Sequence, residues 1–302
     1  MKHLYYSLNQ YLKETFGCKV YKLALSGGMT CPNRDGTLSD KGCIFCSLNG
    51  SGDFAEKKST SITQQIENAK ALVKNKLKSG KYIAYFQDFT NTYAPVEHLR
   101  KIFTEAINHK DIVALSIATR PDCLPNEVLD LLESLNKIKP VWVELGLQTI
   151  HKSTAEYINR GYSLSVFDDA LKKLKSRNIY VVVHMIIGLP NETEKMIYET
   201  AEYIGKSGAD GIKFHLLHVL KDTKLASEYN IGNVNLLSLE EYTKLLIGSI
   251  KRIPKTMAIH RLTGDGKKSL LIAPLWSADK KMVLNYINSE FHRQNLIQGE
   301  LL

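Results

Sequence analysis

Long apolar runs are missing from this sequence, and so is any segment typical of secretion. No window approaches the roughly eighteen consecutive apolar residues that mark a transmembrane helix. The opening stretch, MKHLYYSLNQYLKETFG, lacks the apolar core and small-residue cleavage site of a signal peptide. We therefore expect a cytoplasmic protein with no membrane segment. With 44% hydrophobic and 24% charged residues, the composition also excludes a chain too hydrophilic to fold.

Cysteine is scarce too, with five in 302 residues. Because disulfides are rare in a reducing cytoplasm, the spacing of the cysteines indicates their use. Cys31, Cys43 and Cys46 share one short segment, whereas Cys18 and Cys123 lie outside it. Such a group of three indicates a metal site or catalysis.

The chain alternates between short β-rich runs and stretches of helical periodicity. The β-rich runs end at turn residues and cover 22–26, 82–86, 114–118, 141–147, 180–187 and 211–217. The helical stretches cover 62–77, 96–107, 127–135, 166–174 and 194–204, and further helices are expected at 239–252 and 279–294. Alternation of this kind predicts an α/β fold with parallel strands.

Six units favour a partial (βα)6 TIM-like barrel over a closed barrel of eight. Residues 1–220 would form this barrel and carry the cysteine loop, 27–50. Residues 221–302 would form an α-rich C-terminal extension that packs on the barrel and takes part in substrate binding. In parallel barrels the chemistry lies at the C-terminal ends of the strands, so the residues that close each strand are the candidates.

The cysteine loop directly follows the first strand. Eleven residues separate Cys31 from Cys43, and two separate Cys43 from Cys46. A 4Fe-4S cluster that only transfers electrons has four cysteine ligands, so three ligands leave one iron open. The amino and carboxylate groups of S-adenosylmethionine (SAM) can chelate that iron.

Two alternatives to the cluster stay open. A structural zinc site needs four ligands, and no histidine occurs between His3 and His98, so zinc would need Cys18 or a distant group. A redox dithiol formed by Cys43 and Cys46 leaves the first cysteine of the loop unexplained. Phe45 would shield the cluster or lie near the adenine of SAM, or it is an ordinary core residue.

Several segments resemble a known family. The loop at 31–46, CPNRDGTLSDKGCIFC, resembles the radical SAM signature Cys-x-aromatic-Cys, and its wide first gap is similar to the branch of the Elongator catalytic subunit. The segment IATRPD at 117–122 is similar to the Glu-Thr-Arg-Pro-Asp of that branch, with Ala118 in place of glutamate. The segments YFQDFTNTYAP, KFHLLH and IHRLTGDG resemble the YhcC/YtqA family of radical SAM proteins.

This resemblance implies SAM contacts at the ends of the third and fourth strands. Thr119 and Arg120 follow the third strand. Gln148 closes the fourth, and Arg160 follows it in an Arg-Gly element. The Arg160 guanidinium could pair bidentately with the SAM carboxylate, and a salt bridge within the loop is the alternative.

Polar residues at the end of the second strand, and inside the fourth and fifth strands, are further candidates for SAM binding. Gln87 and Asp88 stand where many members receive the SAM amino group, although they could simply cap the second strand. Glu144 lies in an otherwise apolar strand, where a carboxylate is costly unless it is paired or used. His184 would face the SAM ribose or be a satisfied core histidine.

The sixth strand carries candidates for substrate binding. Lys213, His215 and His218 lie where a substrate should approach, as contacts or as general acids. The Gly-Asp-Gly turn at 264–266 resembles a phosphate-binding turn, although an ordinary hairpin is the alternative.

The net charge of +9 fits a partner that carries phosphates. The resemblance implies a radical SAM enzyme that modifies the wobble uridine of tRNA, converting 5-carboxymethylaminomethyl-uridine to 5-aminomethyl-uridine. Its reductant would be a protein such as flavodoxin or ferredoxin. A radical SAM enzyme acting on a small molecule or peptide, and a non-enzymatic metal-binding protein, stay open as alternatives.

Overall fold

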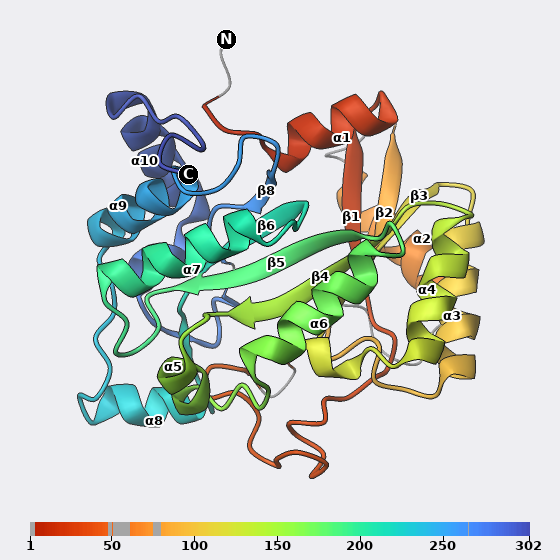
Figure 1. The fold of residues 1–302 in the computed structure, drawn as a ribbon, viewed down its shortest axis with the longest axis horizontal. Helices are drawn as coiled ribbons and strands as arrows, with labels where there is room; N and C mark the ends of the chain where they lie inside the picture. The colour runs from red at the N-terminus through yellow and green to blue at the C-terminus, as the bar shows by residue number, and fades with distance from the viewer. Residues whose placement is uncertain (1–3, 48–49, 51–60, 75–79, 265) are drawn as a thin grey trace.

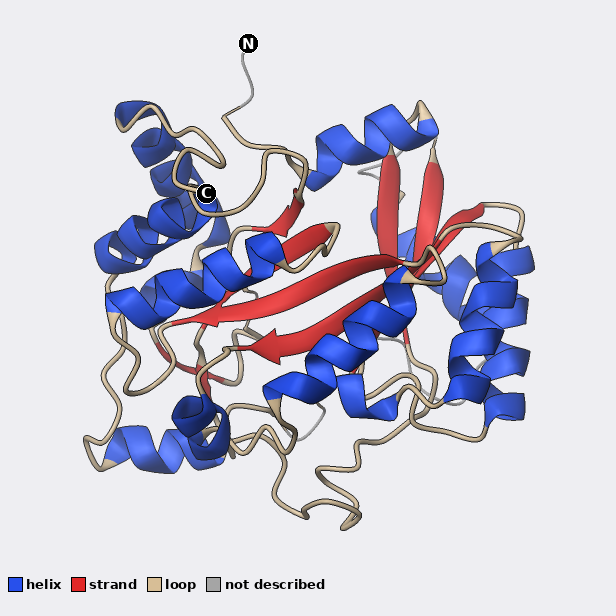
Figure 2. Cartoon of the chain, in the orientation of Figure 1, coloured by secondary structure: helices blue, strands red, loops and turns tan. Residues whose placement is uncertain are grey.

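A curled parallel sheet organises the fold. A computed structural model describes residues 4–47, 50, 61–74, 80–264 and 266–302 (Figure 1). Within these residues, seven strands pair in the order β1-β2-β3-β4-β5-β6-β8. Their bounds are β1 Val20–Leu25, β2 Lys81–Phe86, β3 Ile112–Thr119, β4 Val141–Gln148, β5 Tyr180–Ile187, β6 Gly211–Leu216 and β8 Ala258–Arg261. The sheet forms a half-barrel whose outer face is covered by helices (Figure 2).

The helices follow the strands and bury one apolar side against them. They are α1 Leu8–Phe16, α2 Ile62–Val73, α3 Val96–Asn108, α4 Asn126–Asn136, α5 Lys152–Tyr157, α6 Leu164–Lys175, α7 Glu194–Lys206, α8 Lys224–Asn230, α9 Leu239–Ile250 and α10 Lys280–Arg293. In α3 the buried residues recur every three or four positions, from Leu99 to Ile107, as burial of one helix face requires. A small antiparallel sheet joins β7 Val219–Leu220 to β9 Leu271–Ala273.

The N-terminal end of the half-barrel is closed by α1 and an aromatic cluster. The Tyr11 ring on α1 lies 5.7 Å from the Trp142 ring and 5.1 Å from the Tyr180 ring. The Trp142 ring also packs 5.5 Å from His260. Because Trp142 and Tyr180 lie at the starts of β4 and β5, this cluster fills the lumen at that end and leaves access from the C-terminal ends of the strands.

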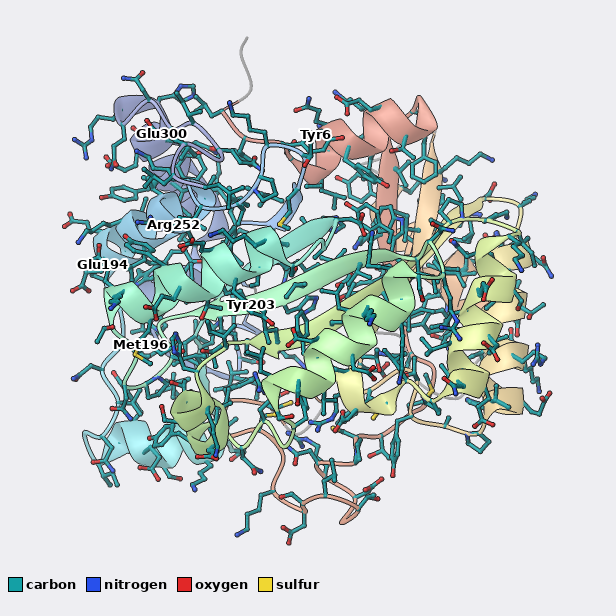
Figure 3. All side chains as sticks on the ribbon, in the orientation of Figure 1. Tyr6, Glu194, Met196, Tyr203, Arg252 and Glu300 are labelled. Carbon is teal, nitrogen blue, oxygen red and sulfur yellow. The ribbon has the colours of Figure 1, made fainter. Side chains whose placement is uncertain are left out.

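The two ends of the described chain lie on the same side of the molecule. Tyr6 and Glu300 are both labelled along the upper edge of Figure 3. The backbone N–H of Tyr6 donates to the Gln298 side chain at 2.8 Å. No helix in the described part of the chain is long and apolar enough to cross a membrane.

The predicted α/β half-barrel is confirmed, and all six predicted strands are present. The prediction missed β8, which pairs with β6 and makes the C-terminal residues part of the same sheet. This strand has only four residues, so it lacks the apolar run by which the others were found. The end of the helix predicted at 62–77, residues 48–49 of the cysteine loop and Asp265 lie outside the described residues.

Candidate active site

One pocket lies at the C-terminal ends of the strands. It is lined by the cysteine loop after β1, by the ends of β2 to β6 and by residues of β8 and the turn after it. Every residue predicted for the site lines this pocket except Asp88 and Lys213, which are buried beside it. Asp88, just after β2, accepts a hydrogen bond from the hydroxyl of Ser26, just after β1. A residue that caps the end of a strand is expected to make a bond of this kind.

Side chains outside the cysteines hold the cysteine loop in place. The Arg34 guanidinium donates to the carbonyl oxygen of Cys46 at 2.7 Å. The Asn33 side chain donates to the carbonyl of Asn159 at 2.6 Å, and the Asn159 side chain returns a bond to the carbonyl of Gly42 at 2.7 Å. The loop is therefore tied to the segment after α5, which closes one side of the pocket.

The three thiols share the pocket but do not form a compact group of ligand atoms. Cys31, Cys43 and Cys46 all line it, and their sulfur atoms do not all lie within 4.8 Å of one another. A zinc ion with Zn–S bonds of about 2.3 Å would bring its sulfur ligands to about 3.8 Å from one another. A cluster, in which each thiolate binds a different iron, accepts the wider spacing. Cys18, the proposed fourth zinc ligand, packs instead beside the aromatic cluster at the closed end of the barrel.

Two arginines stand at the ends of β3 and β4. The Arg120 guanidinium makes two bonds of 2.9 and 2.7 Å to the Asp122 carboxylate and one of 2.9 Å to the carbonyl of Arg160. Burial disfavours the charge on Arg120, but the hydrogen bonds to Asp122 raise its pKa overall. The centre of the Tyr162 ring lies 4.9 Å from the Arg120 guanidinium and 4.6 Å from the Arg160 guanidinium. The positive charge of Arg120 is therefore fixed at the pocket wall.

Arg160 is bound chiefly to backbone. Its guanidinium donates to the carbonyls of Leu147 at 2.8 Å, Thr149 at 2.6 Å and Tyr162 at 2.9 and 3.2 Å. These bonds use all but one of the five N–H groups of an arginine. The expected bidentate pairing of Arg160 with a carboxylate does not fit this arrangement. The residue instead fixes the chain that leaves β4.

A buried ion network crosses the lumen below the pocket. Glu144 on β4 is 0% exposed and accepts bonds from Lys22 on β1 at 2.7 Å and Ser116 on β3 at 2.6 Å. Its second oxygen meets His184 on β5 at 2.8 Å and the Lys213 ammonium on β6. Burial opposes ionisation, but Lys213 and Lys22 hold the pKa of Glu144 well below its usual range. The carboxylate is thus paired, as its burial requires.

The pKa values of two basic groups of the network are also lowered, but here burial is the cause. Burial lowers the pKa of Lys213 to about 7 and that of His184 to about 4. The Lys213 ammonium also donates to the Tyr85 hydroxyl on β2 at 3.0 Å. The network therefore connects all six strands from β1 to β6 across the lumen and forms the floor of the pocket.

The sequence analysis did not assign several residues that help to build the site, including Arg34, which holds the cysteine loop. Lys22, Tyr85 and Tyr162 contact predicted site residues, and Arg261 on β8 lines the pocket. The one available signal was Lys22, a charged residue inside an apolar strand like Glu144. Arg261 lay in a segment used for the family resemblance, but its strand was not predicted.

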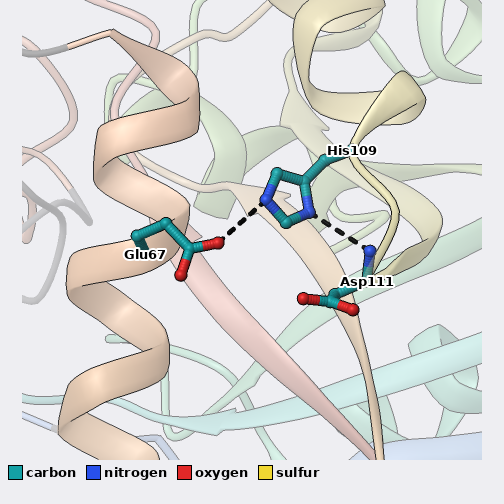
Figure 4. Close-up of side chains that lie close together, drawn as sticks. All are labelled: Glu67, His109 and Asp111. Atoms are coloured by element: carbon teal, nitrogen blue, oxygen red, sulfur yellow. Dashed lines mark hydrogen bonds and ion pairs between the residues drawn. The ribbon is translucent and has the colours of Figure 1, made fainter.

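A second group of metal-ligand side chains lies elsewhere. Glu67, His109 and Asp111 have ligand atoms within 4.8 Å of one another (Figure 4). The Lys70 ammonium lies 2.8 Å from Glu67 and 2.7 Å from Asp111. Because Lys70 already pairs with both carboxylates, and Asp111 precedes β3 at the end of the sheet opposite the pocket, we interpret this group as a surface ion-pair cluster.

Comparison with known families identifies the pocket. The family model of the radical SAM superfamily matches residues 31–204, from the first cysteine of the loop to α7. The chain belongs to the radical SAM superfamily. A model of the radical SAM C-terminal domain matches residues 209–293, which include β6, β8 and α9. The protein is therefore a SAM-dependent enzyme, and its family implies a 4Fe-4S cluster.

Its similar proteins include uncharacterised ones. Protein YtqA of Bacillus subtilis, named as uncharacterised, is 47% identical over 98% of this chain and 92% of its own length. Protein YhcC of Escherichia coli K12 is 39% identical over 89% of this chain and 86% of its own length. Human Elongator complex protein 3 is 24% identical over 58% of this chain and 31% of its own length.

Solved structures share the fold. The archaeal Elp3 of Methanocaldococcus infernus superposes with a TM-score of 0.69 at 17% identity, over 92% of this chain and 64% of that chain. Methylornithine synthase, PylB, gives a TM-score of 0.53 at 12% identity over 93% of this chain. The half-barrel is therefore the radical SAM fold.

Proposed function

We propose that Cys31, Cys43 and Cys46 hold a 4Fe-4S cluster and that SAM binds beside it in the pocket. The observation that carries this proposal is the convergence of the three thiols on one pocket of a radical SAM chain. Arg34, Arg120 and Arg160 line the same pocket, and their charges suit an anionic cluster. When bound, the reduced cluster supplies one electron for the cleavage of SAM.

The residues around the thiols would bind and orient SAM. Gln87, Thr119 and Gln148 line the pocket at the ends of β2, β3 and β4, and we assign them to polar contacts with SAM. Arg120 keeps N–H groups beyond those bonded to Asp122 and Arg160, so it can also receive the SAM carboxylate. Phe45, beside the last cysteine, would exclude water.

Three predicted SAM contacts act differently in this proposal. Arg160 holds the chain after β4 through its bonds to backbone carbonyls. Glu144 has both oxygens bonded to protein groups, so it positions Lys22 and Lys213 rather than touching SAM. His184 donates to this carboxylate, and the rest of its ring is left to face the pocket.

The proposed substrate is the wobble uridine of tRNA. The chain is similar over 59% of its length to a protein of Methanocaldococcus jannaschii named tRNA uridine(34) acetyltransferase, and over 58% to human Elongator complex protein 3. The net charge of +9 suits an RNA partner. We propose the step from 5-carboxymethylaminomethyl-uridine to 5-aminomethyl-uridine, with a cytoplasmic reductant such as flavodoxin or ferredoxin.

Nucleoside mass spectrometry tests this assignment. Transfer RNA from cells that lack the protein should accumulate 5-carboxymethylaminomethyl-uridine and lose 5-aminomethyl-uridine. Returning the wild-type gene should restore the modification, whereas a Cys43→Ala gene should not. An unchanged wobble-uridine profile would refute the tRNA assignment, and SAM cleavage by the purified protein would then favour a small-molecule or peptide substrate.

A further inference from the structure

One buried asparagine of the cysteine loop contacts a thiol. Asn33 comes two residues after Cys31 and is 1% exposed. Its amide nitrogen lies 3.6 Å from the Sγ atom of Cys43, within hydrogen-bond distance for a sulfur acceptor. The same nitrogen donates to the carbonyl oxygen of Asn159 at 2.6 Å. An amide nitrogen carries two hydrogens, so it can serve both acceptors at once.

The contact with Asn159 decides which way the Asn33 amide faces. The nitrogen and oxygen of an amide side chain are told apart by their hydrogen-bond partners. The carbonyl oxygen of Asn159 can only accept, so an amide oxygen 2.6 Å from it would be repelled. The Asn33 amide oxygen has no hydrogen-bond partner among the described residues, so no bond there favours the reverse orientation. The N–H group of Asn33, and not its oxygen, therefore faces the Cys43 sulfur.

The chain around Asn33 leaves this donor little room to move. The carbonyl oxygen of Asn33 accepts from the backbone N–H of Gly42 at 2.6 Å. On the other side, a Cβ placed on Gly161 would lie 3.2 Å from the Asn33 amide oxygen, so the segment after α5 packs closely on the amide. A donor that is fixed in this way needs no rearrangement when the charge on its acceptor changes.

A hydrogen bond to a ligand sulfur changes the energy of an electron added to an iron-sulfur cluster. Hydrogen bonds to the sulfurs are among the features that set the reduction potential of such a cluster. A thiolate ligand becomes more negative when the cluster is reduced, and an N–H donor binds the more negative sulfur more strongly. Because Asn33 is buried, water competes little for this bond.

We propose that Asn33 raises the reduction potential of the cluster through its N–H bond to Cys43. This inference rests on the proposed function, in which Cys43 is a ligand of the cluster. Asn33 is then a positioning residue that acts through Cys43 and does not touch SAM. Its bond favours the one-electron reduction that precedes SAM cleavage, whether the electron comes from dithionite or from a low-potential electron-transfer protein.

The test compares substitutions that loosen the same part of the loop. Asn33→Ala removes the donor to Cys43, and Asn33→Leu removes it while filling the space of the amide. The matched control is Asn159→Gly, which removes the side-chain bonds of Asn159 to Gly42 and Ser39 but keeps the carbonyl that Asn33 binds. Glycine suits the φ of +53° at residue 159.

The reduction potential is measured on protein reconstituted anaerobically with iron and sulfide. Samples are poised with dithionite and mediator dyes, and the electron paramagnetic resonance signal of the reduced cluster is followed. Asn33→Ala and Asn33→Leu should lower the equilibrium constant for reduction about 10-fold, which is about 59 mV for one electron. Asn159→Gly should melt at a lower temperature than the wild type but keep its potential. Simple loosening would admit water, which favours the more negative reduced cluster and so raises the potential.

The other outcomes overturn the proposal in distinguishable ways. An unchanged or raised potential in both Asn33 variants, or an equal decrease in Asn159→Gly, would show that the bond to Cys43 does not set the potential. If neither Asn33 variant retains the cluster and Asn159→Gly does, Asn33 is needed to hold the cluster and the proposed role is wrong. A wild type that takes up no iron and sulfide would refute the proposed function itself.

Discussion

Removing the buried carboxylate of Glu144 should destabilise the fold more than removing a surface carboxylate. Glu144→Gln keeps the size of the side chain but replaces one oxygen by an NH2 group that faces the donors of Lys213 and His184. Breaking a buried ion pair by removing one partner costs about 3–5 kcal/mol. The pKa of Lys213 is already about 7, so this lysine can lose its proton and limit the cost to about 3 kcal/mol.

This cost corresponds to a measurable shift in melting temperature. An unfolding entropy of about 2.1 cal/mol/K per residue, over 302 residues, predicts a decrease of about 5 °C. The matched control is Glu133→Gln on α4, whose ion pairs with Lys137 and Arg177 are both 3.5 Å long and lie at the surface. It should cost less than about 1 kcal/mol. Circular dichroism melts that show the same temperature for both variants would refute the ion-network account.

The pH dependence gives a second check on Glu144. Although burial opposes ionisation, Lys213 and Lys22 hold its pKa in the folded protein well below the usual range of a glutamate. The stabilisation from its charge is therefore complete above the pKa of the unfolded chain and is lost as the pH falls below that value. The difference in melting temperature between wild type and Glu144→Gln should narrow as the pH falls from about 5 toward about 3. A difference in melting temperature that is the same at about pH 5 and at about pH 3 would contradict the assigned charge of Glu144.

Two further substitutions test the frame of the pocket. Arg160→Lys removes a guanidinium that donates to three backbone carbonyls. We expect the free energy of unfolding to fall by about 2–4 kcal/mol in thermal melts, and SAM to bind more weakly in equilibrium dialysis. An unchanged melting temperature would show that these bonds are dispensable. Gly161→Ala places a Cβ 3.2 Å from Asn33 at a φ of +83°, and Gly208→Ala has a φ of +82° but open space. The left-handed backbone should lower the free energy of unfolding of both variants by about 1–2 kcal/mol. Only Gly161→Ala should also bind SAM more weakly. Equal SAM affinity in the two variants would show that the added Cβ does not crowd the site.

The fold was largely predictable because its strands are continuous apolar runs between turn residues. Most residues of the six predicted strands are buried, under the helices outside or along the lumen inside, so the local sequence indicates the strands. The strand β8 was not predictable in this way. Its four residues, Ala258–Arg261, become a strand only because β6 offers an unpaired edge far away in sequence.

The candidate site was predictable only in part, for a related reason. The spacing of Cys31, Cys43 and Cys46 is local, and it indicated a metal site directly. The partners of Glu144 are not local, because Lys22 and Lys213 come from strands that are not its neighbours in the sheet. Only the curl of the sheet brings them together. The same holds for Arg160, whose acceptors are backbone carbonyls that carry no sequence signal.

Metal analysis of the anaerobically reconstituted protein tests the central claim most directly. The wild type should contain about four iron and four sulfide per chain and should convert SAM to 5′-deoxyadenosine when reduced. Substituting Cys31, Cys43 or Cys46 by alanine should abolish SAM cleavage and lower the iron content, whereas Cys18→Ala should retain both. One zinc per chain without iron or sulfide, or full SAM cleavage by any of the three loop variants, would contradict the account.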